Sequence, residues 1–297
     1  MRLRIMARMD TIKHIFQTRT LPVSFEMFPP KGDLTLETAR EVARGMAACA
    51  PDFISVTYSA AGSGNGKATS AIAAMIQDEF QVTSVAHLTC ISATDDALAA
   101  AITDMRNRGI ANVLALRGDL VEGQEPSRYR YAKDLIPVLK DAGFCVGAAA
   151  YPEGHITCED DALNIEHLKM KQDAGADFFV TQLCFDNERI YRFADAADKA
   201  GITTPITYGI MPFMSKSQLQ RMVFMCGSSL PSPVIKLLAK HEDDPDALRA
   251  AGVAYACEQL VDLARHGVGG LHVYAMNHPD IAQATTEALA AAGFREA

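Results

Sequence analysis

Eight short apolar segments recur along the chain, and each is followed by a stretch with the spacing of an amphipathic helix. They are rich in Val, Ile, Phe and Ala, and several are apolar almost throughout, which is typical of parallel strands covered on both faces. Most begin roughly 30 residues after the one before, the length of one strand-plus-helix unit. They occupy residues 22–28, 53–58, 83–90, 112–119, 145–153, 178–185, 206–211 and 271–277.

Helix signals fill the intervals between these segments. Thr94 precedes two acidic residues and is predicted to cap a helix over residues 93–109, because a threonine hydroxyl accepts a hydrogen bond from a free first-turn amide. Gly109 is predicted to end this helix. The interval before the eighth segment is longer and carries three helix-like stretches, so we expect an extra helix there. These stretches lie at residues 215–227, 232–241 and 244–267.

Eight such units predict an α/β protein with a single (β/α)₈ barrel over residues 21–297. Residues 1–20 are predicted to form an N-terminal extension with a helix. A length of 297 residues would allow two domains, but α/β barrels commonly run this long as one. In a barrel of this type the C-terminal ends of the strands meet at one rim, where the active site lies.

The composition narrows the class of partner. A net charge of −8 argues against nucleic acid or an anionic membrane as the main partner. No apolar run approaches the length of about 18 residues that a membrane span requires. The basic first ten residues are not followed by the apolar core of a signal peptide. We therefore expect a soluble, cytoplasmic protein.

The seven cysteines give little sign of disulfides or of a metal site. Their number is odd and no two form a C-x-x-C pair. His155 and Cys158 lie close in sequence, but two ligands on a predicted loop are a weak zinc signal. The strand ends also lack an H-x-H cluster, which disfavours a metal-dependent hydrolase. We expect no metal.

A glycine-rich segment, GSGNGK, follows the second strand at residues 62–67. It lacks the spacing of a phosphate-binding P-loop, and Ala68 stands where such a loop needs Ser or Thr. It does not match G-x-G-x-x-G either. We interpret it as a flexible loop.

Polar side chains gather near the ends of the predicted strands, and the barrel would bring them to one rim. Each has a structural alternative: Arg117 and Asp119 could pair with neighbours, His87 and Tyr274 could pack in the core, and Gln182 could bridge two strands. The full set is Glu26, Thr57, His87, Arg117, Asp119, Tyr151, Glu153, Gln182 and Tyr274.

Glu26 ends the first strand between two phenylalanines and just before two prolines. Apolar surroundings disfavour the charged form of a carboxyl group, so we expect the pKa of Glu26 to be raised. It could then act as an acid near neutral pH. The alternative is a carboxylate held in a salt bridge at the rim.

Nine segments together resemble the methylenetetrahydrofolate reductases. They cover most of the chain, in the order and at the strand ends that this family requires. Each segment is a weak signal, whereas nine in register are a strong one. The segments are SFEMFPP, SVTYSA, AHLTC, ALRGD, AAYPEGH, KQDAGAD, TQLCFD, GIMP and HVYAMN.

The resemblance implies a flavoprotein that holds FAD at the C-terminal rim of the barrel. Such an enzyme takes hydride from NADH or NADPH and reduces 5,10-methylenetetrahydrofolate to 5-methyltetrahydrofolate in a ping-pong sequence, a step of one-carbon metabolism that supports methionine biosynthesis. It also implies a homo-oligomer. An alternative is a folate- and flavin-binding subunit of a larger complex, which receives electrons from a partner protein.

The resemblance also assigns residues. Glu26 would protonate N10 of the folate, and Asp119 would stabilise the iminium cation that follows. The implied FAD contacts are Thr57, Tyr58, His87, Arg117, Gly118, Asp119, Tyr151, His155, Asn164 and Lys171. The implied substrate contacts are Glu26, Gln182, Met222, Tyr274 and His278.

Several positions depart from the family pattern. Asn164, His167 and Met170 stand where Asp, Asn and Arg are frequent, which removes an expected contact to the FAD pyrophosphate. Met222 replaces a frequent aromatic residue, and His278 replaces a usual Arg. These changes bear on the affinity for FAD and on the electron donor more than on the fold.

Overall fold

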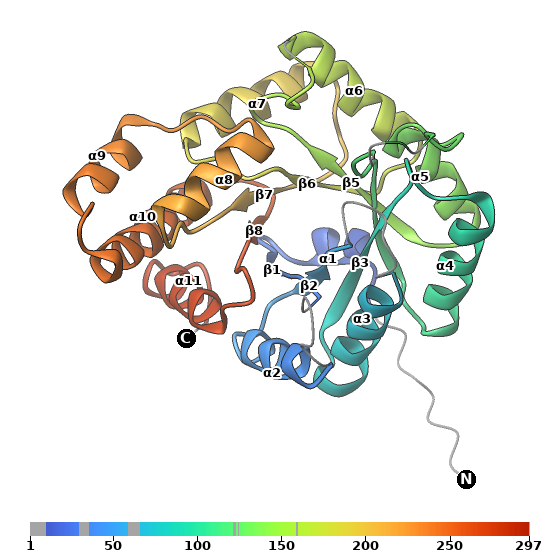
Figure 1. Cartoon of the computed structure of the whole chain (residues 1–297), viewed down its shortest axis with the longest axis horizontal. Helices are drawn as coiled ribbons and strands as arrows, with labels where there is room; N and C mark the ends of the chain where they lie inside the picture. The colour runs from blue at the N-terminus through green and yellow to red at the C-terminus, as the bar shows by residue number, and fades with distance from the viewer. Residues whose placement is uncertain are drawn as a thin grey trace.

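Eight parallel strands pair in chain order and close into a barrel, and helices lie around it (Figure 1). The computed structural model describes residues 10–29, 36–58, 66–120, 123, 125–158 and 160–296. The strands are β1 (Val23–Met27), β2 (Phe53–Val56), β3 (Thr83–Thr89), β4 (Asn112–Leu116), β5 (Cys145–Ala150), β6 (Phe178–Thr181), β7 (Ile206–Ile210) and β8 (Leu271–Val273). The predicted (β/α)₈ barrel is confirmed.

Helices follow the strands as the sequence pattern predicts. They are α1 (Ile12–Thr18), α2 (Leu36–Ala47), α3 (Gly66–Phe80), α4 (Asp95–Asn107), α5 (Ala132–Asp141), α6 (Asp161–Asp173), α7 (Asn187–Lys199), α8 (Lys216–Cys226), α9 (Ser232–Lys240), α10 (Pro245–Arg265) and α11 (Pro279–Ala291). Three of them, α8 to α10, separate β7 from β8, so the additional helical structure predicted before the last strand is present.

Local capping explains where α4 begins and ends. The Thr94 hydroxyl accepts a hydrogen bond from the amide of Ala97 at 3.2 Å. Gly109 follows the helix with a φ of 71°, a left-handed conformation that glycine adopts without steric cost. Both predictions are confirmed. Residues 62–65 of the glycine-rich segment lie outside the described residues, and its last two residues begin α3.

The N-terminal end of the barrel is closed by apolar packing. Phe53, Phe178 and neighbouring strand residues form one buried cluster with Ile12 and Ile15 of α1. The α1 helix thus covers this end, which leaves the opposite end for a site. The separation of residues 1–20 from the barrel as a distinct segment stays a prediction. Within the described residues, no helix is both long and apolar enough to cross a membrane.

Barrel closure also sets the register at the future site. β1 pairs with β8 so that Ser24 lies opposite His272, and β1 pairs with β2 so that Glu26 lies opposite Ser55. Because successive side chains of a strand point to opposite faces, Ser24 and Glu26 both point into the barrel. The register therefore brings a carboxylate, two hydroxyls and an imidazole together inside it.

Candidate active site

Glu26 lies at the centre of a buried polar cluster. Its Oε2 is 3.6 Å from Nε2 of His87 and 3.6 Å from Nε2 of His272, and Ser55 Oγ lies 3.5 Å away. The His272 side chain has no exposed surface, and that of Glu26 keeps 18% of its surface exposed. The carboxyl group can therefore face a ligand, whereas the imidazole that supports it cannot.

His272 is held by Ser24 of the neighbouring strand. Ser24 Oγ donates to the carbonyl of Leu271 at 3.2 Å and lies 2.7 Å from Nδ1 of His272. In the second contact either the hydroxyl or Nδ1–H is the donor, because the hydroxyl carries one proton. Among the described residues the buried Nε2 has no hydrogen-bond partner, and it lies 3.6 Å from Oε2 of Glu26. The imidazole therefore faces the carboxyl group inside the barrel.

The expectation of a raised pKa for Glu26 is wrong. Burial acts in the predicted direction, but the hydrogen bond with His272 and the charges of His87 and His272 outweigh it and lower the pKa of Glu26. Burial lowers the pKa of His87 to about 4, although the charge of Glu26 opposes this. The prediction failed because it considered only the apolar residues next to Glu26 in the sequence. In the folded barrel the carboxyl group lies beside the imidazoles of His87 and His272.

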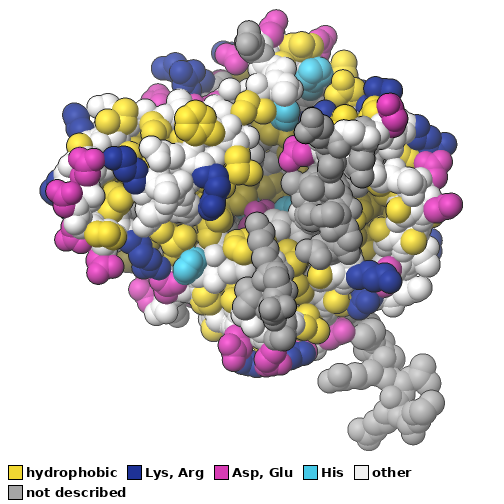
Figure 2. All heavy atoms as spheres, in the orientation of Figure 1, with side chains coloured by type: hydrophobic (Ala, Val, Ile, Leu, Met, Phe, Trp, Pro, Cys, Tyr) yellow, Lys and Arg dark blue, Asp and Glu magenta, His cyan; other side chains and the backbone are white. Residues whose placement is uncertain are grey.

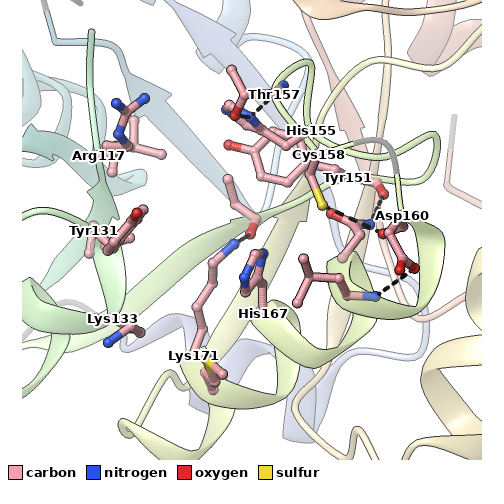
Figure 3. A pocket seen from close by; sticks show the side chains of 17 residues that line it. Arg117, Tyr131, Lys133, Tyr151, His155, Thr157, Cys158, Asp160, His167 and Lys171 are labelled. Atoms are coloured by element: carbon pink, nitrogen blue, oxygen red, sulfur yellow. Dashed lines mark hydrogen bonds between the residues drawn. The ribbon is translucent and has the colours of Figure 1, made fainter. Parts of the chain in front are cut away.

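A cavity of about 660 Å³ opens between the ends of β4 and β5 and the helices α5 and α6. Figure 2 shows the hollow on this face of the molecule, with hydrophobic side chains around it. Arg117, Tyr131 and Lys133 lie along one side, and Lys171 and His167 of α6 lie on the other (Figure 3). The walls thus combine positive charge with aromatic and aliphatic surface, which suits a ligand carrying both phosphate and an aromatic ring.

Five of the predicted cofactor contacts line this cavity: Arg117, Tyr151, His155, Asn164 and Lys171. They come from the ends of β4 and β5, from the loop at residues 151–158 and from α6. The predicted departures at His167 and Met170 line it as well. The structure therefore brings this group together as the resemblance implies.

Lys171 is a largely buried cation of the cavity. Its Nζ donates to the carbonyl of Ala149 at 2.8 Å and lies 5.1 Å from the centre of the Tyr151 ring. Burial lowers the pKa of Lys171 to about 8. One carbonyl and one ring leave the ammonium group poorly compensated, so an anion in the cavity would be stabilised by it.

The wall opposite Arg117 is held by contacts within the β5–α6 loop. The Tyr151 and His155 rings meet edge to face with centroids 4.9 Å apart, and Asn164 donates to the carbonyl of Tyr151 at 2.9 Å. Burial and the charges of Arg117 and Lys171 lower the pKa of His155. Asn164 is buried, and its amide holds the loop as well as facing the cavity.

Arg117 and Asp119 follow β4 and do not pair through their side chains in any recorded contact. The buried Nε of Arg117 has no hydrogen-bond partner, and the guanidinium lines the cavity. Asp119 is exposed at the rim, and its carbonyl accepts from the hydroxyl of Ser92 at 3.3 Å. An unpartnered buried donor is costly, which indicates that Arg117 is arranged for a ligand.

The other predicted cofactor contacts lie away from the cavity lining. Thr57 and Tyr58 follow β2 and are half-buried, and Gly118 lies between Arg117 and Asp119 with a φ of 75°. His87 lies inside the barrel against Glu26. Direct contacts of these residues with FAD stay predictions.

Two of the predicted substrate contacts meet where β6 and β8 end. The Tyr274 hydroxyl donates to the carbonyl of Thr181 at 2.6 Å, and its ring stands edge-on to His272 with centroids 5.1 Å apart. Gln182 follows directly, and its Oε1 accepts from the amide of Leu183 at 3.0 Å. Tyr274 thus supports both the acid cluster and the backbone that carries Gln182.

The remaining two lie further along the rim. Met222 of α8 is half-buried and packs against the same buried cluster as Tyr274 and Met276. His278 precedes α11, and its Nδ1 is 3.7 Å from Oδ1 of Asp280. No recorded contact joins His278 to the Glu26 cluster, so its predicted role is untested.

Sequence reasoning missed two residues of the site and one buried polar residue of α8. The alternation of side chains along a strand could have identified His272 and Ser24. Each lies two residues before a residue predicted to face the site, and residues two apart on a strand share a face. The third is Gln218 of α8. Its Oε1 accepts from the amide of Met214 at 2.7 Å, and its buried Nε2 has no partner. Only the packing of α8 over the barrel reveals it.

The fold and the site define a (β/α)₈ barrel with a buried carboxyl–imidazole cluster inside it and a cationic, aromatic cavity at the ends of β4 and β5. The family model described as methylenetetrahydrofolate reductase matches residues 11–290. The chain therefore belongs to the methylenetetrahydrofolate reductase family and is an oxidoreductase, which confirms the predicted family and enzyme class.

Relatives agree with this assignment. The chain is 35% identical over 268 residues to 5,10-methylenetetrahydrofolate reductase of Escherichia coli (strain K12), with 90% of each chain covered. It is 33% identical over 276 residues to methylenetetrahydrofolate reductase 1 of Schizosaccharomyces pombe and 32% identical over 285 residues to methylenetetrahydrofolate reductase (NADH) 1 of Arabidopsis thaliana. Both matches cover 90% of this chain. They cover only 46% of the Schizosaccharomyces pombe protein and 48% of the Arabidopsis thaliana protein.

One solved structure shares the fold. A Clostridium thermocellum protein that binds two copies of 5-methyl-5,6,7,8-tetrahydrofolic acid superposes with a TM-score of 0.65. The match covers 93% of this chain and 96% of that chain at 14% sequence identity. At this identity the likeness extends to the fold alone.

Proposed function

We propose that this chain reduces 5,10-methylenetetrahydrofolate to 5-methyltetrahydrofolate, with FAD as cofactor and NADH or NADPH as donor. The observation that carries the proposal is the buried cluster of Glu26 with two imidazoles inside the barrel, together with a cavity suited to a nucleotide at the ends of β4 and β5. The folate-binding protein from Clostridium thermocellum and the relative named for NADH support the choice of substrate and donor.

Opening the five-membered ring of the substrate requires a proton at N10. Glu26 points into the barrel and keeps part of its surface exposed, so it is the member of the cluster that can reach a ligand. Its Oε2 lies 3.6 Å from Nε2 of His87 and of His272, so these two imidazoles influence how tightly the carboxyl group holds its proton. After the transfer, His272 and Ser55 remain as the neighbours of the ionised carboxylate.

The cation that ring opening creates needs a counter-charge. Asp119 lies at the rim after β4 and is the proposed source. At 4 Å, a unit charge pair is worth about 1 kcal/mol in water and about 4 kcal/mol at an effective dielectric near 20. Substrate binding would exclude water from this exposed carboxylate. The attraction between the carboxylate and the cation would then rise toward about 4 kcal/mol.

The cavity fits FAD better than a neutral ligand. Arg117 carries a buried unpartnered donor, and Lys171 has one carbonyl and one ring for compensation, so both favour a pyrophosphate. Tyr131 and Leu163 offer surface to an adenine. When bound, FAD would supply the ring that takes hydride from the nicotinamide and passes it to the folate, so the substrates would react in turn.

Purification of the chain tests the proposal directly. Heat-released flavin should run as FAD on chromatography, NADH or NADPH should bleach the bound flavin under anaerobic conditions, and 5,10-methylenetetrahydrofolate should restore its colour. An FAD-supplemented sample that binds no flavin would contradict the proposal. A flavin that neither nucleotide reduces would favour the alternative in which a partner protein is the donor. Cytoplasmic location and homo-oligomer formation are further parts of this proposal.

A further inference from the structure

Glu153 links two parts of the site that no strand pairing connects. It belongs to the β5–α6 loop at residues 151–158, whose residues Tyr151 and His155 form a wall of the cavity. Its carboxylate accepts from the hydroxyl of Ser229 at 2.5 Å and lies 3.3 Å from the amide of Ser229. Ser229 lies in the loop between α8 and α9, 76 residues further along the chain.

Further contacts make this junction specific. Gly227 ends α8 with a φ of 70°, and a Cβ built on it would lie 3.4 Å from the Ile156 side chain. The buried Ser228 hydroxyl donates to the carbonyl of Leu183 at 3.2 Å. Burial chiefly, and the nearby Glu153 carboxylate in addition, raise the pKa of the Cys184 thiol. Glu153 therefore lies where the β5–α6, β6–α7 and α8–α9 loops meet.

The α8 helix lies over the other side of the site. Met222 of α8 and Tyr274 pack against the same buried cluster, which includes Leu219 of α8 and Leu183, the residue after Gln182. Ser228, next to Ser229, holds the carbonyl of Leu183. The contact between Glu153 and Ser229 therefore joins the cavity wall to the chain that follows α8 and to the segment that carries Gln182.

We propose that Glu153 is a positioning residue that couples the flavin cavity to the folate side of the site by fixing α8 against the β5–α6 loop. A flavin nucleotide in the cavity orders the loop, and Glu153 transmits that order to α8. Each ligand then raises the affinity for the other by the same factor, since coupling between two binding sites is reciprocal. This inference rests on the proposed function.

The measured quantity is the ratio of the dissociation constants of FAD without and with saturating tetrahydrofolate. Quenching of flavin fluorescence under anaerobic conditions reports FAD binding. Tetrahydrofolate lacks the one-carbon group, so it cannot exchange hydride with the flavin. We expect a ratio well above one for the wild-type chain. Glu153→Ala should reduce it roughly three- to tenfold, the range for loss of one or two exposed hydrogen bonds.

Three further variants sharpen the test. Ser229→Ala keeps the backbone amide and should cause a smaller loss, and Glu153→Gln keeps an acceptor oxygen and should retain most of the coupling. Lys216→Ala is the matched control. It breaks an exposed contact of α8, to Glu242 at 2.9 Å, that does not reach the cavity loop. It should leave the ratio unchanged.

The outcomes separate this proposal from the proposed function. If the wild-type chain binds neither FAD nor tetrahydrofolate, the proposed function is wrong and the coupling falls with it. If both bind but their affinities are independent, or if Glu153→Ala keeps the wild-type ratio, only the role of Glu153 is overturned. Should Glu153→Ala fail to fold, Ser229→Ala decides in the same way.

Discussion

Replacing Lys171 by Met should stabilise the FAD-free protein and at the same time weaken FAD binding. Burial lowers the pKa of Lys171 from 10.5 to about 8. The unfolded chain therefore binds the proton more tightly than the folded chain does. Stability then rises with pH wherever the unfolded state holds more protons, here between about pH 8 and 10.5. Below that range the folded protein carries the full cost of the buried charge.

The size of this cost follows from the gap between the two pKa values. At about 1.4 kcal/mol for each pH unit, the gap corresponds to about 3 kcal/mol near pH 7. Met replaces the cation with apolar volume and removes the cost, but it also loses the hydrogen bond to Ala149 and the contact with the Tyr151 ring. Those losses are worth about 1–2 kcal/mol together, which leaves a net gain of about 1–2 kcal/mol near pH 7.

Urea unfolding of FAD-free protein at two pH values provides the measurement. The advantage of Lys171→Met over wild type should shrink by about 2 kcal/mol between about pH 7 and pH 9.5, because the wild type loses its buried charge over that interval. Lys133→Met is the control, since Lys133 lines the same cavity but is partly exposed and paired with Asp134 at 3.2 Å. An equal difference at both pH values would refute a buried charge at Lys171.

Three other substitutions probe the chemistry of the site. Glu26→Gln should slow the folate half-reaction roughly 10²- to 10⁴-fold and spare flavin reduction, because only the folate step needs a proton at N10; equal losses in anaerobic stopped-flow traces of both steps would make Glu26 structural. Asp119→Asn should slow the folate half-reaction roughly 5- to 1000-fold and raise the flavin potential, and an unaltered potential with normal turnover would place Asp119 away from the flavin. Gln182→Glu should weaken folate binding roughly 5- to 150-fold in difference titrations, whereas lost FAD with normal folate affinity would mean that this residue serves the other ligand.

The barrel could be predicted because its signal is repeated along the chain. Apolar segments at regular intervals are a local property, and the helix caps that separate them, such as Thr94 and Gly109, depend on a few adjacent residues. The same reasoning placed Arg117 and Tyr151 near strand ends, whereas His155, Asn164 and Lys171 were assigned through the family resemblance. For residues at the ends of successive strands, the position in the sequence is enough to predict that they lie at the rim of the barrel.

The α8 region shows where that reasoning stops. Gln218 lies on a helix inserted between β7 and β8, and nothing in the repeat specifies how such an insertion packs over the rim. Glu153 was identified by its place near the end of β5, but its contact with Ser229, 76 residues away in another loop, was not. Contacts of this kind depend on packing between elements, so a pattern confined to one element cannot identify them.

The acid cluster joins the two cases. Glu26 was selected by its place at a strand end, but the direction of its pKa depends on His272, which is 246 residues away in sequence and lies one strand away in the closed barrel. Pairing of β1 with β8 closes the barrel and sets Ser24 opposite His272. The Ser24 hydroxyl contacts this imidazole, and the imidazole lies 3.6 Å from the Glu26 carboxyl group and contributes to its lowered pKa. The acid strength of Glu26 is therefore a property of the closed barrel rather than of the segment that carries Glu26.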